Sequence, residues 1–308
     1  MIIILVRRAR IASVAAALSA AALVACDSDD EEGASIAATT GVTADVAERV
    51  AGPGVDVEQI VPDGASPHDF ELSAQDRQRL EEADLIVANG AGLEAGIPLD
   101  EIDAPTWELS DHAGELRPLE EIEGEEHAEG EEEHATGDPH VWMDPTRVAR
   151  ALPSLADALA EVHPEYAAEY RRRAREYARR LDSLDARVDD TLAAVPRSDR
   201  ELVTSHDSLG YLAERYDFEV AATAFPATGA EAEASADTLH DVEVAVRESG
   251  VPAVFAQEGD DPEALRLIAE QTGVEVNYGL LVESPSVAGS YEAMLRRDAK
   301  LIARSLGD

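Results

Sequence analysis

The fold is decided by the stretch PEYAAEYRRRAREYARRLDSLDARVDDTLAA, residues 164–194, because it predicts one long amphipathic helix. Its apolar residues recur at steps of three and four and form one stripe: Tyr166, Tyr170, Ala174, Tyr177, Leu181, Leu184, Val188 and Leu192. At 1.5 Å per residue, a helix of roughly 30 residues is about 45 Å long, the length of a whole domain. We therefore expect a spine that joins two lobes. The alternative is a coiled coil that pairs two copies of the chain.

The residues before this helix alternate between strand-like and helix-like patterns. Strands are expected at 35–40, 55–61, 84–88 and 107–109, and helices at 43–50 and 73–82. This alternation is typical of a parallel α/β lobe. We place that N-terminal lobe at residues 34–144 and assign residues 145–196 to linking helices.

The same alternation resumes after Pro196. Strands are expected at 201–204, 218–222, 253–256 and 274–277, and helices at 209–216, 236–248, 262–272 and 291–306. Residues 197–308 therefore form a second α/β lobe. The fold class that follows is α/β, with two parallel-sheet lobes joined by the long spine helix.

Three histidines stand in three separate local contexts. His68 lies in SPHDF after an expected strand, His140 lies in DPHVWMDP, and His206 lies in VTSHDS after another expected strand. Neutral imidazole is a versatile ligand for borderline metals. The wide spacing excludes a zinc finger, whose ligands stand in short pairs. Because ligands of parallel sheets bind beyond the carboxyl ends of the strands, we expect a metal site in the cleft between the lobes.

The N-terminus has the pattern of a bacterial lipoprotein signal. Three arginines precede an alanine-rich apolar run, residues 11–25, which ends in LVAC at Cys26. This predicts a signal peptide at residues 1–25, lipidation of Cys26 and an acidic tether at residues 26–33. The alternative is a permanent membrane anchor, although the run is shorter than the roughly 20 residues that a span needs. We expect an extracytoplasmic protein that is lipid-anchored to the cell membrane.

Charge and cysteine content limit the partners. The formal net charge is -40, with 65 acidic and 25 basic residues, which disfavours nucleic acid as a partner. Cys26 is the only cysteine, so neither disulfides nor cysteine-ligated metals are expected. Ten of the nineteen residues at 120–138 are acidic, which predicts a solvated loop. Its two histidines, His127 and His134, could hold zinc weakly as an accessory site.

Four segments together resemble the solute-binding lipoproteins that serve zinc or manganese ABC importers. They are VPDGASPHDFELSAQD at 61–76, ADLIVANGAGLE at 83–94, DPHVWMDP at 138–145 and LVTSHDSLGYLAERYDFEV at 202–220. The resemblance covers roughly residues 35–305. Each segment alone is weak, whereas the four in this order are highly specific.

The resemblance implies a metal site made by His68, His140 and His206. Histidine at position 206 is similar to the zinc-binding subgroup, whereas the manganese-binding subgroup typically carries glutamate there. The family usually takes its fourth ligand from an aspartate in a D-S-L context, but this chain has LVESP at 281–285, so Glu283 is the best match. Asp207 and Glu258 are the reserve ligands. Asp69 and Asp144 are expected to support the site from outside the ligand set.

The expected function is capture of Zn²⁺ outside the cytoplasm and its delivery to the permease of an ABC importer, by a monomer that makes and breaks no covalent bond. A manganese or iron receptor of the same family is the first alternative. A zinc hydrolase is the alternative of another class, because three histidines and a water are also a catalytic arrangement. The chain has neither an HExxH helix nor a nucleophile elbow to support it. A surface adhesin is a further alternative that no motif encodes.

Overall fold

The computed structural model describes residues 34–118, 137–225, 236–257 and 262–307. These described residues belong to one compact unit. Within the described residues, we find no helix that combines the length and the apolar character needed to cross a bilayer.

The first lobe is built on a four-stranded parallel sheet. Its strands are β1 (Ser35–Ala38), β2 (Asp56–Gln59), β3 (Leu85–Ala88) and β4 (Thr106–Glu108), in the order β2-β1-β3-β4. Its helices are α1 (Gly41–Ala51), α2 (Ala74–Glu81) and α3 (Leu109–His112). The central strand β3 is buried at all four residues, as expected where helices cover both faces of a parallel sheet. Thr40 and Thr43 form a capping box that starts α1 directly after β1.

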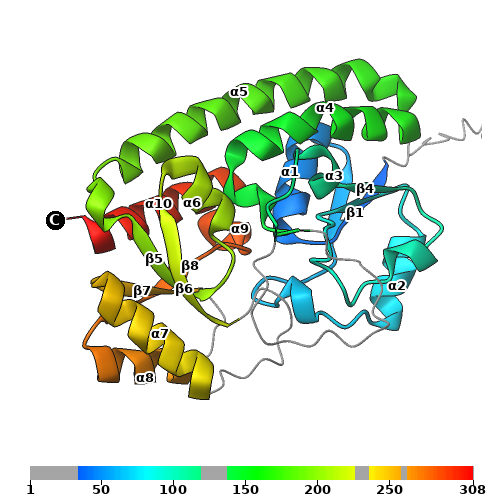
Figure 1. The fold of residues 1–308 in the computed structure, drawn as a ribbon. Coiled ribbons are helices and arrows are strands. Elements are labelled where there is room, and N and C mark those ends of the chain that lie inside the picture. The colour runs from blue at the N-terminus through cyan, green and yellow to red at the C-terminus, as the bar shows by residue number, and fades with distance from the viewer. Residues whose placement is uncertain (1–33, 119–136, 226–235, 258–261, 308) are drawn as a thin grey trace, which may run out of the picture. The chain divides into compact units, whose positions relative to one another are not determined.

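The second lobe repeats this plan (Figure 1). Its strands are β5 (Glu201–His206), β6 (Glu219–Phe225), β7 (Ala253–Gln257) and β8 (Glu275–Leu280), all parallel, in the order β6-β5-β7-β8. Its helices are α6 (Gly210–Tyr216), α7 (Ala236–Ser249), α8 (Pro262–Thr272), α9 (Pro285–Ala288) and α10 (Tyr291–Leu306). The expected fold class, two parallel α/β lobes, is confirmed.

Two long helices connect the lobes. These are α4 (Pro145–Val162) and α5 (Ala167–Leu192), and they pack against each other along their length. Helix α5 has 26 residues and is shorter than the sequence suggested, because Pro164–Tyr166 forms a separate 3-10 turn. Tyr166 therefore leaves the expected stripe and is 42% exposed.

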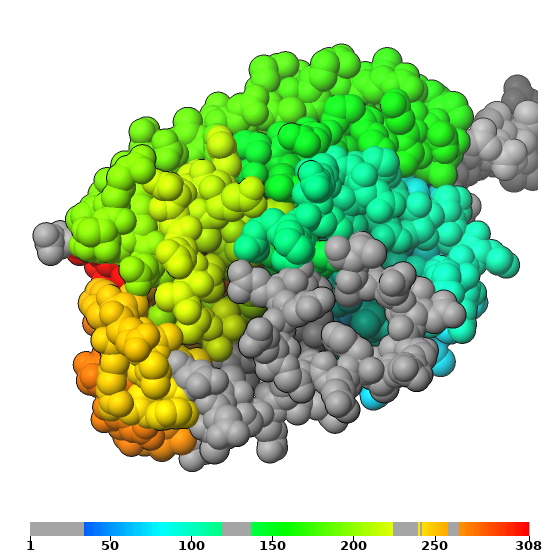
Figure 2. Space-filling model, in the orientation of Figure 1, coloured from blue at the N-terminus to red at the C-terminus, as the bar shows by residue number. Residues whose placement is uncertain are grey.

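The remaining apolar residues of the α5 stripe pack inside the protein. Its members are all buried: Tyr170, Ala174, Tyr177, Leu181, Leu184, Val188 and Leu192. They face α4, α1 of the first lobe and α10 of the second, and Figure 2 shows α4 and α5 (green) lying against both lobes. A spine helix uses its apolar face in this way. The stripe is thus not available for a coiled coil with a second copy.

One hydrophobic core runs through both lobes. It includes Leu85 of the first sheet, Leu184 of α5 and Phe255 of the second sheet. Two smaller clusters lie on other faces of the sheets, one in each lobe. Because the lobes share a close-packed core, they are held together far more firmly than two domains on a flexible linker.

Candidate metal centre

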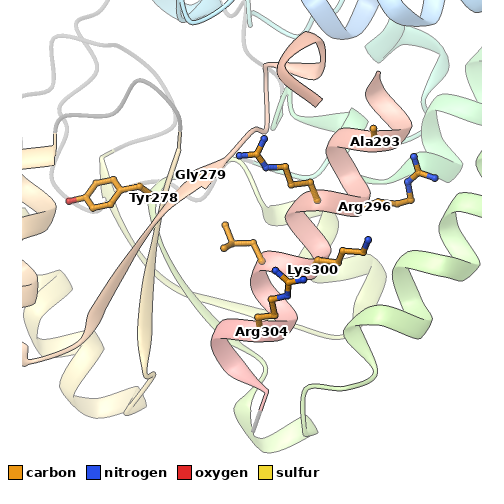
Figure 3. A pocket seen from close by; sticks show the side chains of 8 residues that line it. Tyr278, Gly279, Ala293, Arg296, Lys300 and Arg304 are labelled. Atoms are coloured by element: carbon orange, nitrogen blue, oxygen red, sulfur yellow. The ribbon is translucent and has the colours of Figure 1, made fainter. Parts of the chain in front are cut away.

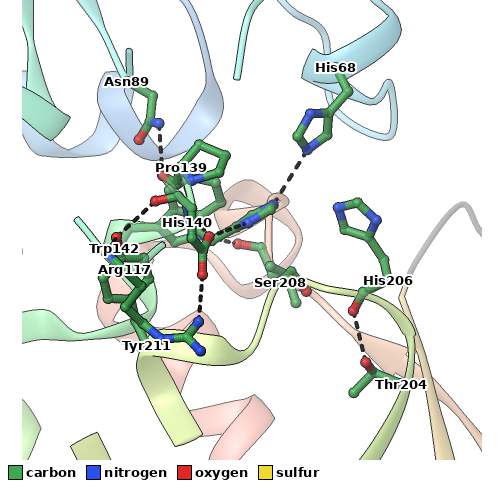
Figure 4. Close-up of polar contacts among 12 residues, drawn as sticks. His68, Asn89, Arg117, Pro139, His140, Trp142, Thr204, His206, Ser208 and Tyr211 are labelled. Atoms are coloured by element: carbon green, nitrogen blue, oxygen red, sulfur yellow. Dashed lines mark hydrogen bonds and ion pairs between the residues drawn. The ribbon is translucent and has the colours of Figure 1, made fainter. Parts of the chain in front are cut away.

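The four expected ligands come from four separate segments. His68 lies in a 3-10 turn, Pro67–Asp69, which follows β2, and His140 begins the 3-10 turn Val141–Met143. His206 is the last residue of β5, and Glu283 lies between β8 and α9. The structure brings all four together, with one potential ligand atom of each within 4.8 Å of the others. Figure 4 shows the three imidazole rings converging.

The spacing of the imidazoles suits one tetrahedral ion. Nε2 of His68 and Nε2 of His140 are 3.4 Å apart. Two nitrogens at the usual zinc distance of about 2.1 Å and the tetrahedral angle are separated by about 3.4 Å. The three ring centroids lie 5.2 to 5.4 Å apart, and the rings are tilted or edge-on rather than stacked. Nitrogen atoms rather than ring faces therefore point toward the centre.

Burial keeps His68 neutral. Loss of solvent and, to a smaller extent, the neighbouring rings of His140 and His206 together lower its pKa to about 2, because both disfavour a positive charge on the ring. An imidazole must be neutral to offer a lone pair to a metal. His68 is therefore ready to bind a cation at any physiological pH.

A buried carboxylate fixes the ring of His140, whose side chain is fully buried. Oδ1 of Asp138 accepts a hydrogen bond from the backbone N–H of His140 at 2.9 Å and lies 2.9 Å from its Nδ1. A carboxylate at Nδ1 places the ring proton there, which leaves the lone pair on Nε2, the atom that faces His68. Burial alone would raise the pKa of Asp138, but its hydrogen bonds with His140 and the charge of Arg117 lower it overall.

Asp138 is itself held on its other side. Nη1 of Arg117 donates to Oδ2 of Asp138 at 2.8 Å, and the hydroxyl of Tyr211 donates to the Asp138 carbonyl at 2.8 Å (Figure 4). Nδ2 of Asn89 donates to the carbonyl of Pro139 at 2.9 Å. The segment before His140 is thus tied to the first lobe by Asn89 and to the second lobe by Tyr211.

Three aspartates near the site, Asp138, Asp144 and Asp69, can be compared with their expected roles. We assigned Asp138 to a solvated acidic loop at 120–138, but it is only 2% exposed, so Asp138 is not a solvated loop residue. Asp144, expected to support the site, caps α4 by accepting from the backbone N–H of Thr146 at 2.8 Å. The carboxylate of Asp144 contacts α4 and lies 4.0 Å from Arg215, and its backbone N–H donates to the carbonyl of Val141 at 3.3 Å. Asp69 lies exposed at the end of the His68 turn.

His206 lies at the end of β5, beside hydrogen bonds made by Gln257 of β7 and Thr204 of β5. Nε2 of Gln257 donates to the hydroxyl of Ser208 at 2.7 Å, and the hydroxyl of Thr204 donates to the His206 carbonyl at 2.8 Å. Asp207, a reserve ligand, is not among the four clustered residues. Four other expected sites lie outside the described residues: Cys26, His127, His134 and Glu258.

The turn that carries Glu283 is fixed through the backbone of the two preceding residues. Nε1 of Trp142 donates to the Val282 carbonyl at 2.7 Å, and the Leu281 N–H donates to Oδ1 of Asp298 at 3.0 Å. The Trp142 ring also lies 5.2 Å from the His140 ring. Trp142 therefore joins the segments of two expected ligands. Burial raises the pKa of Asp298 to about 7.

Glu94 is a supporting residue that the sequence analysis did not assign. It is 5% exposed, and it accepts hydrogen bonds from the backbone N–H groups of Asn89 at 2.8 Å and Gly90 at 3.1 Å. It also accepts from the hydroxyl of Thr39, and burial raises its pKa. Glu94 thereby fixes the end of β3, from which Asn89 reaches the His140 segment. Its signal was present in ANGAGLE, one of the four motif segments.

Comparisons with known proteins show the family of the chain. The family model described as zinc-uptake complex component A, periplasmic, matches residues 36–305. The manganese ABC transporter substrate-binding lipoprotein PsaA of Streptococcus mitis is 27% identical, over 94% of this chain and 96% of its own length. The iron-binding protein YfeA of Yersinia pestis is 27% identical, over 91% of this chain and 88% of its own.

A solved structure shows the same fold. The periplasmic zinc binding protein TroA from Treponema pallidum superposes with a TM-score of 0.79 at 24% identity, over 90% of this chain and 100% of TroA. The family is a solute-binding component of transport rather than a class of enzymes. The chain belongs to the family of zinc-uptake complex component A, and is the metal-binding component of an ABC-type metal importer.

Proposed function

We propose that the protein captures Zn²⁺ outside the cytoplasm and delivers it to the permease of its importer. The observation that carries this proposal is the convergence of three imidazole groups and one carboxylate, from His68, His140, His206 and Glu283, within 4.8 Å. Three nitrogens and one oxygen are a donor set that zinc favours. The same four residues are the ligands we propose.

The donor set supports zinc over the other metals in the relatives' names. PsaA is named for manganese, YfeA for iron and TroA for zinc, so similarity alone does not choose among them. Manganese is suited by octahedral sites rich in oxygen, whereas imidazole suits zinc. The 3.4 Å spacing between the nitrogens of His68 and His140 also fits a tetrahedral ion. Against copper, which binds such donors more tightly, selectivity depends on geometry and supply.

Calorimetric titration of the metal-free protein with Zn²⁺ and Mn²⁺ tests the metal. We expect one tightly bound zinc and much weaker manganese. Manganese binding equal to or tighter than zinc would overturn the zinc assignment but leave the importer component in place.

We also propose that a lipid on Cys26 anchors the protein, with a signal peptide at residues 1–25 and a tether at 26–33. The LVAC pattern supports this, as does the description of PsaA as a lipoprotein. Cys26→Ser should release the protein from the membrane fraction and leave zinc affinity unchanged. Retention of the variant in the membrane fraction would argue for another anchor.

The acidic segment is proposed as an accessory site, where His127 and His134 bind zinc weakly beside many carboxylates. Deletion of residues 120–136 should leave the tight site intact and remove only weak additional binding. Zinc stoichiometry measured by chelator competition distinguishes tight binding from weak additional binding. Loss of the tight site on deletion would place that site in the acidic segment instead.

A further inference from the structure

A basic cavity lies in the second lobe, between β8 and α10. It has a volume of about 450 Å³ and is lined by Tyr278, Gly279, Ala293, Arg296, Arg297, Lys300, Leu301 and Arg304. Figure 3 shows β8 on one side and the cationic side chains of α10 on the other. Four of the eight lining residues are cationic and none is acidic. Such a concentration is unexpected in a chain with 65 acidic and 25 basic residues.

Several cations elsewhere on the described surface are paired with acids. On α5, for example, Arg171 pairs with Asp157 and Arg172 pairs with Glu176. Among the residues that the structure describes, no ion pair joins Arg296, Arg297, Lys300 or Arg304 to a carboxylate. No direct ion pair therefore offsets the repulsion among these four cations.

The backbone leaves the cavity open at Gly279. This residue has a φ of +128°, and a Cβ placed on it would lie 3.9 Å from Nη2 of Arg297. A side chain here would point toward the guanidinium and reduce the space beside it. Glycine at this position satisfies the unusual φ and keeps the cavity accessible.

We propose that this cavity binds a compact, multiply charged oxyanion, with phosphate as the recognised group. Guanidinium groups present several N–H donors in a fixed plane that matches phosphate oxygens, and the lysine adds a point charge. A volume of about 450 Å³ lies within the range of small-ligand sites. An extended polyanion is disfavoured by the net charge of -40 of the whole chain, whereas a compact anion needs to contact only the cavity. The phosphate group can be free in solution or belong to a lipid headgroup.

Calorimetry on the metal-free protein with inorganic phosphate and with pyrophosphate tests the proposal. The triple variant Arg297→Gln, Lys300→Gln, Arg304→Gln removes three cations from the cavity. Its matched control, Arg175→Gln, Arg179→Gln, Arg187→Gln, removes three exposed cations from α5. We expect saturable binding whose affinity falls at least about tenfold in the cavity variant, because loss of one charge-assisted hydrogen bond alone costs about tenfold. In the control, the affinity should fall less than about twofold.

Cosedimentation with phosphatidylglycerol vesicles, against phosphatidylcholine vesicles, identifies the source of the phosphate. Binding of the free anions that depends on the cavity assigns a soluble ligand. Binding only to phosphatidylglycerol, again lost in the cavity variant, assigns a lipid headgroup. The proposal is wrong if neither probe binds, or if the cavity variant and the control lose binding equally.

Discussion

The segments that carry His140 and Glu283 meet at one centre but are held in different ways. The His140 ring is fully buried, and the carboxylate of Asp138 contacts both its backbone N–H and its Nδ1. Around Glu283, the contacts that fix the turn are made to the backbone of Leu281 and Val282. The proposed ligand His140 is therefore oriented at its ring, and the segment of the proposed ligand Glu283 is positioned through the backbone of its turn.

This difference indicates which part of the site is prepared before the metal arrives. A ligand whose ring is already oriented loses little freedom on binding, so more of its interaction with the ion remains as affinity. A carboxylate on a turn also has a ready substitute, since water can take its place in zinc coordination. We expect the histidines to dominate affinity and the Glu283 side to contribute less.

The largest effect is expected from His140→Ala. Structural zinc sites gain roughly 10–16 kcal/mol from about four ligands, so loss of one oriented ligand should cost on the order of 3 kcal/mol, or at least about a hundredfold in affinity. Chelator competition measures it. His240→Ala, on the exposed side of α7, is the control and should leave zinc affinity unchanged. Equal losses in the two variants would mean that His140 is not a ligand.

Glu283→Ala should weaken zinc less, by roughly tenfold to a hundredfold, because water fills the vacated position. The same chelator competition applies. Asp207→Ala is a matched control, since Asp207 is a neighbouring carboxylate outside the cluster. A larger loss in Glu283→Ala than in His140→Ala would reverse the comparison between the two segments.

Asp138→Asn tests orientation without removing a ligand. The amide oxygen can still accept from Nδ1 of His140, but it carries no charge, so we expect the lower end of the usual range for such partners, about tenfold. Nitrogen-15 spectra of the His140 ring would show whether the proton leaves Nδ1. A purely structural role for Asp138 would change the thermal midpoint without changing that tautomer. Asp182→Asn, exposed on α5, controls for the loss of one negative charge.

The fold was largely predictable because its signals are local. The three- and four-residue steps between Tyr170 and Leu192 are a property of one helix, and the apolar run at Leu85–Ala88 is a property of one buried strand. Convergence of His68 and His206 was expected from their positions after strands, and His140 was added by the family resemblance. Helix and strand boundaries shifted by a few residues, as at Pro164–Tyr166, where a 3-10 turn precedes α5.

The supports of the site were harder to predict because they join distant residues. Asp138 ends an acidic segment, and only its contacts with His140 and with Arg117, 21 residues away, explain its burial. The bond from Trp142 to the Val282 carbonyl spans 140 residues. From the sequence alone, the cations of α10 belong to an ordinary solvent-exposed helix face. The cavity forms only because β8 lies on one side of them. The composition of a segment can be seen in its own sequence, whereas the burial of its residues depends on which distant segment packs against it.

The smallest effect on zinc affinity is expected from Asp298→Asn, which tests how the turn that carries Glu283 is held. Asparagine keeps an oxygen to accept from Leu281 N–H, so zinc affinity should change less than about threefold. Stability should respond more. The pKa of Asp298 is raised from 3.8 to about 7 by burial, so between these values the folded protein keeps a proton that the unfolded chain loses. Stability from this group is therefore present at pH 4 and decreases as pH rises toward 7.

Urea unfolding of the metal-free protein at pH 5 and pH 8 measures this contribution. On going from pH 5 to pH 8 the wild type should lose more stability than Asp298→Asn, by on the order of a few kcal/mol, since each pKa unit corresponds to about 1.4 kcal/mol. Asp182→Asn should follow the wild type. A parallel pH dependence of all three proteins would show that Asp298 is ionised in the folded state. The Glu283 turn would then be held by a charged hydrogen bond, and its backbone support would be as strong as that of His140.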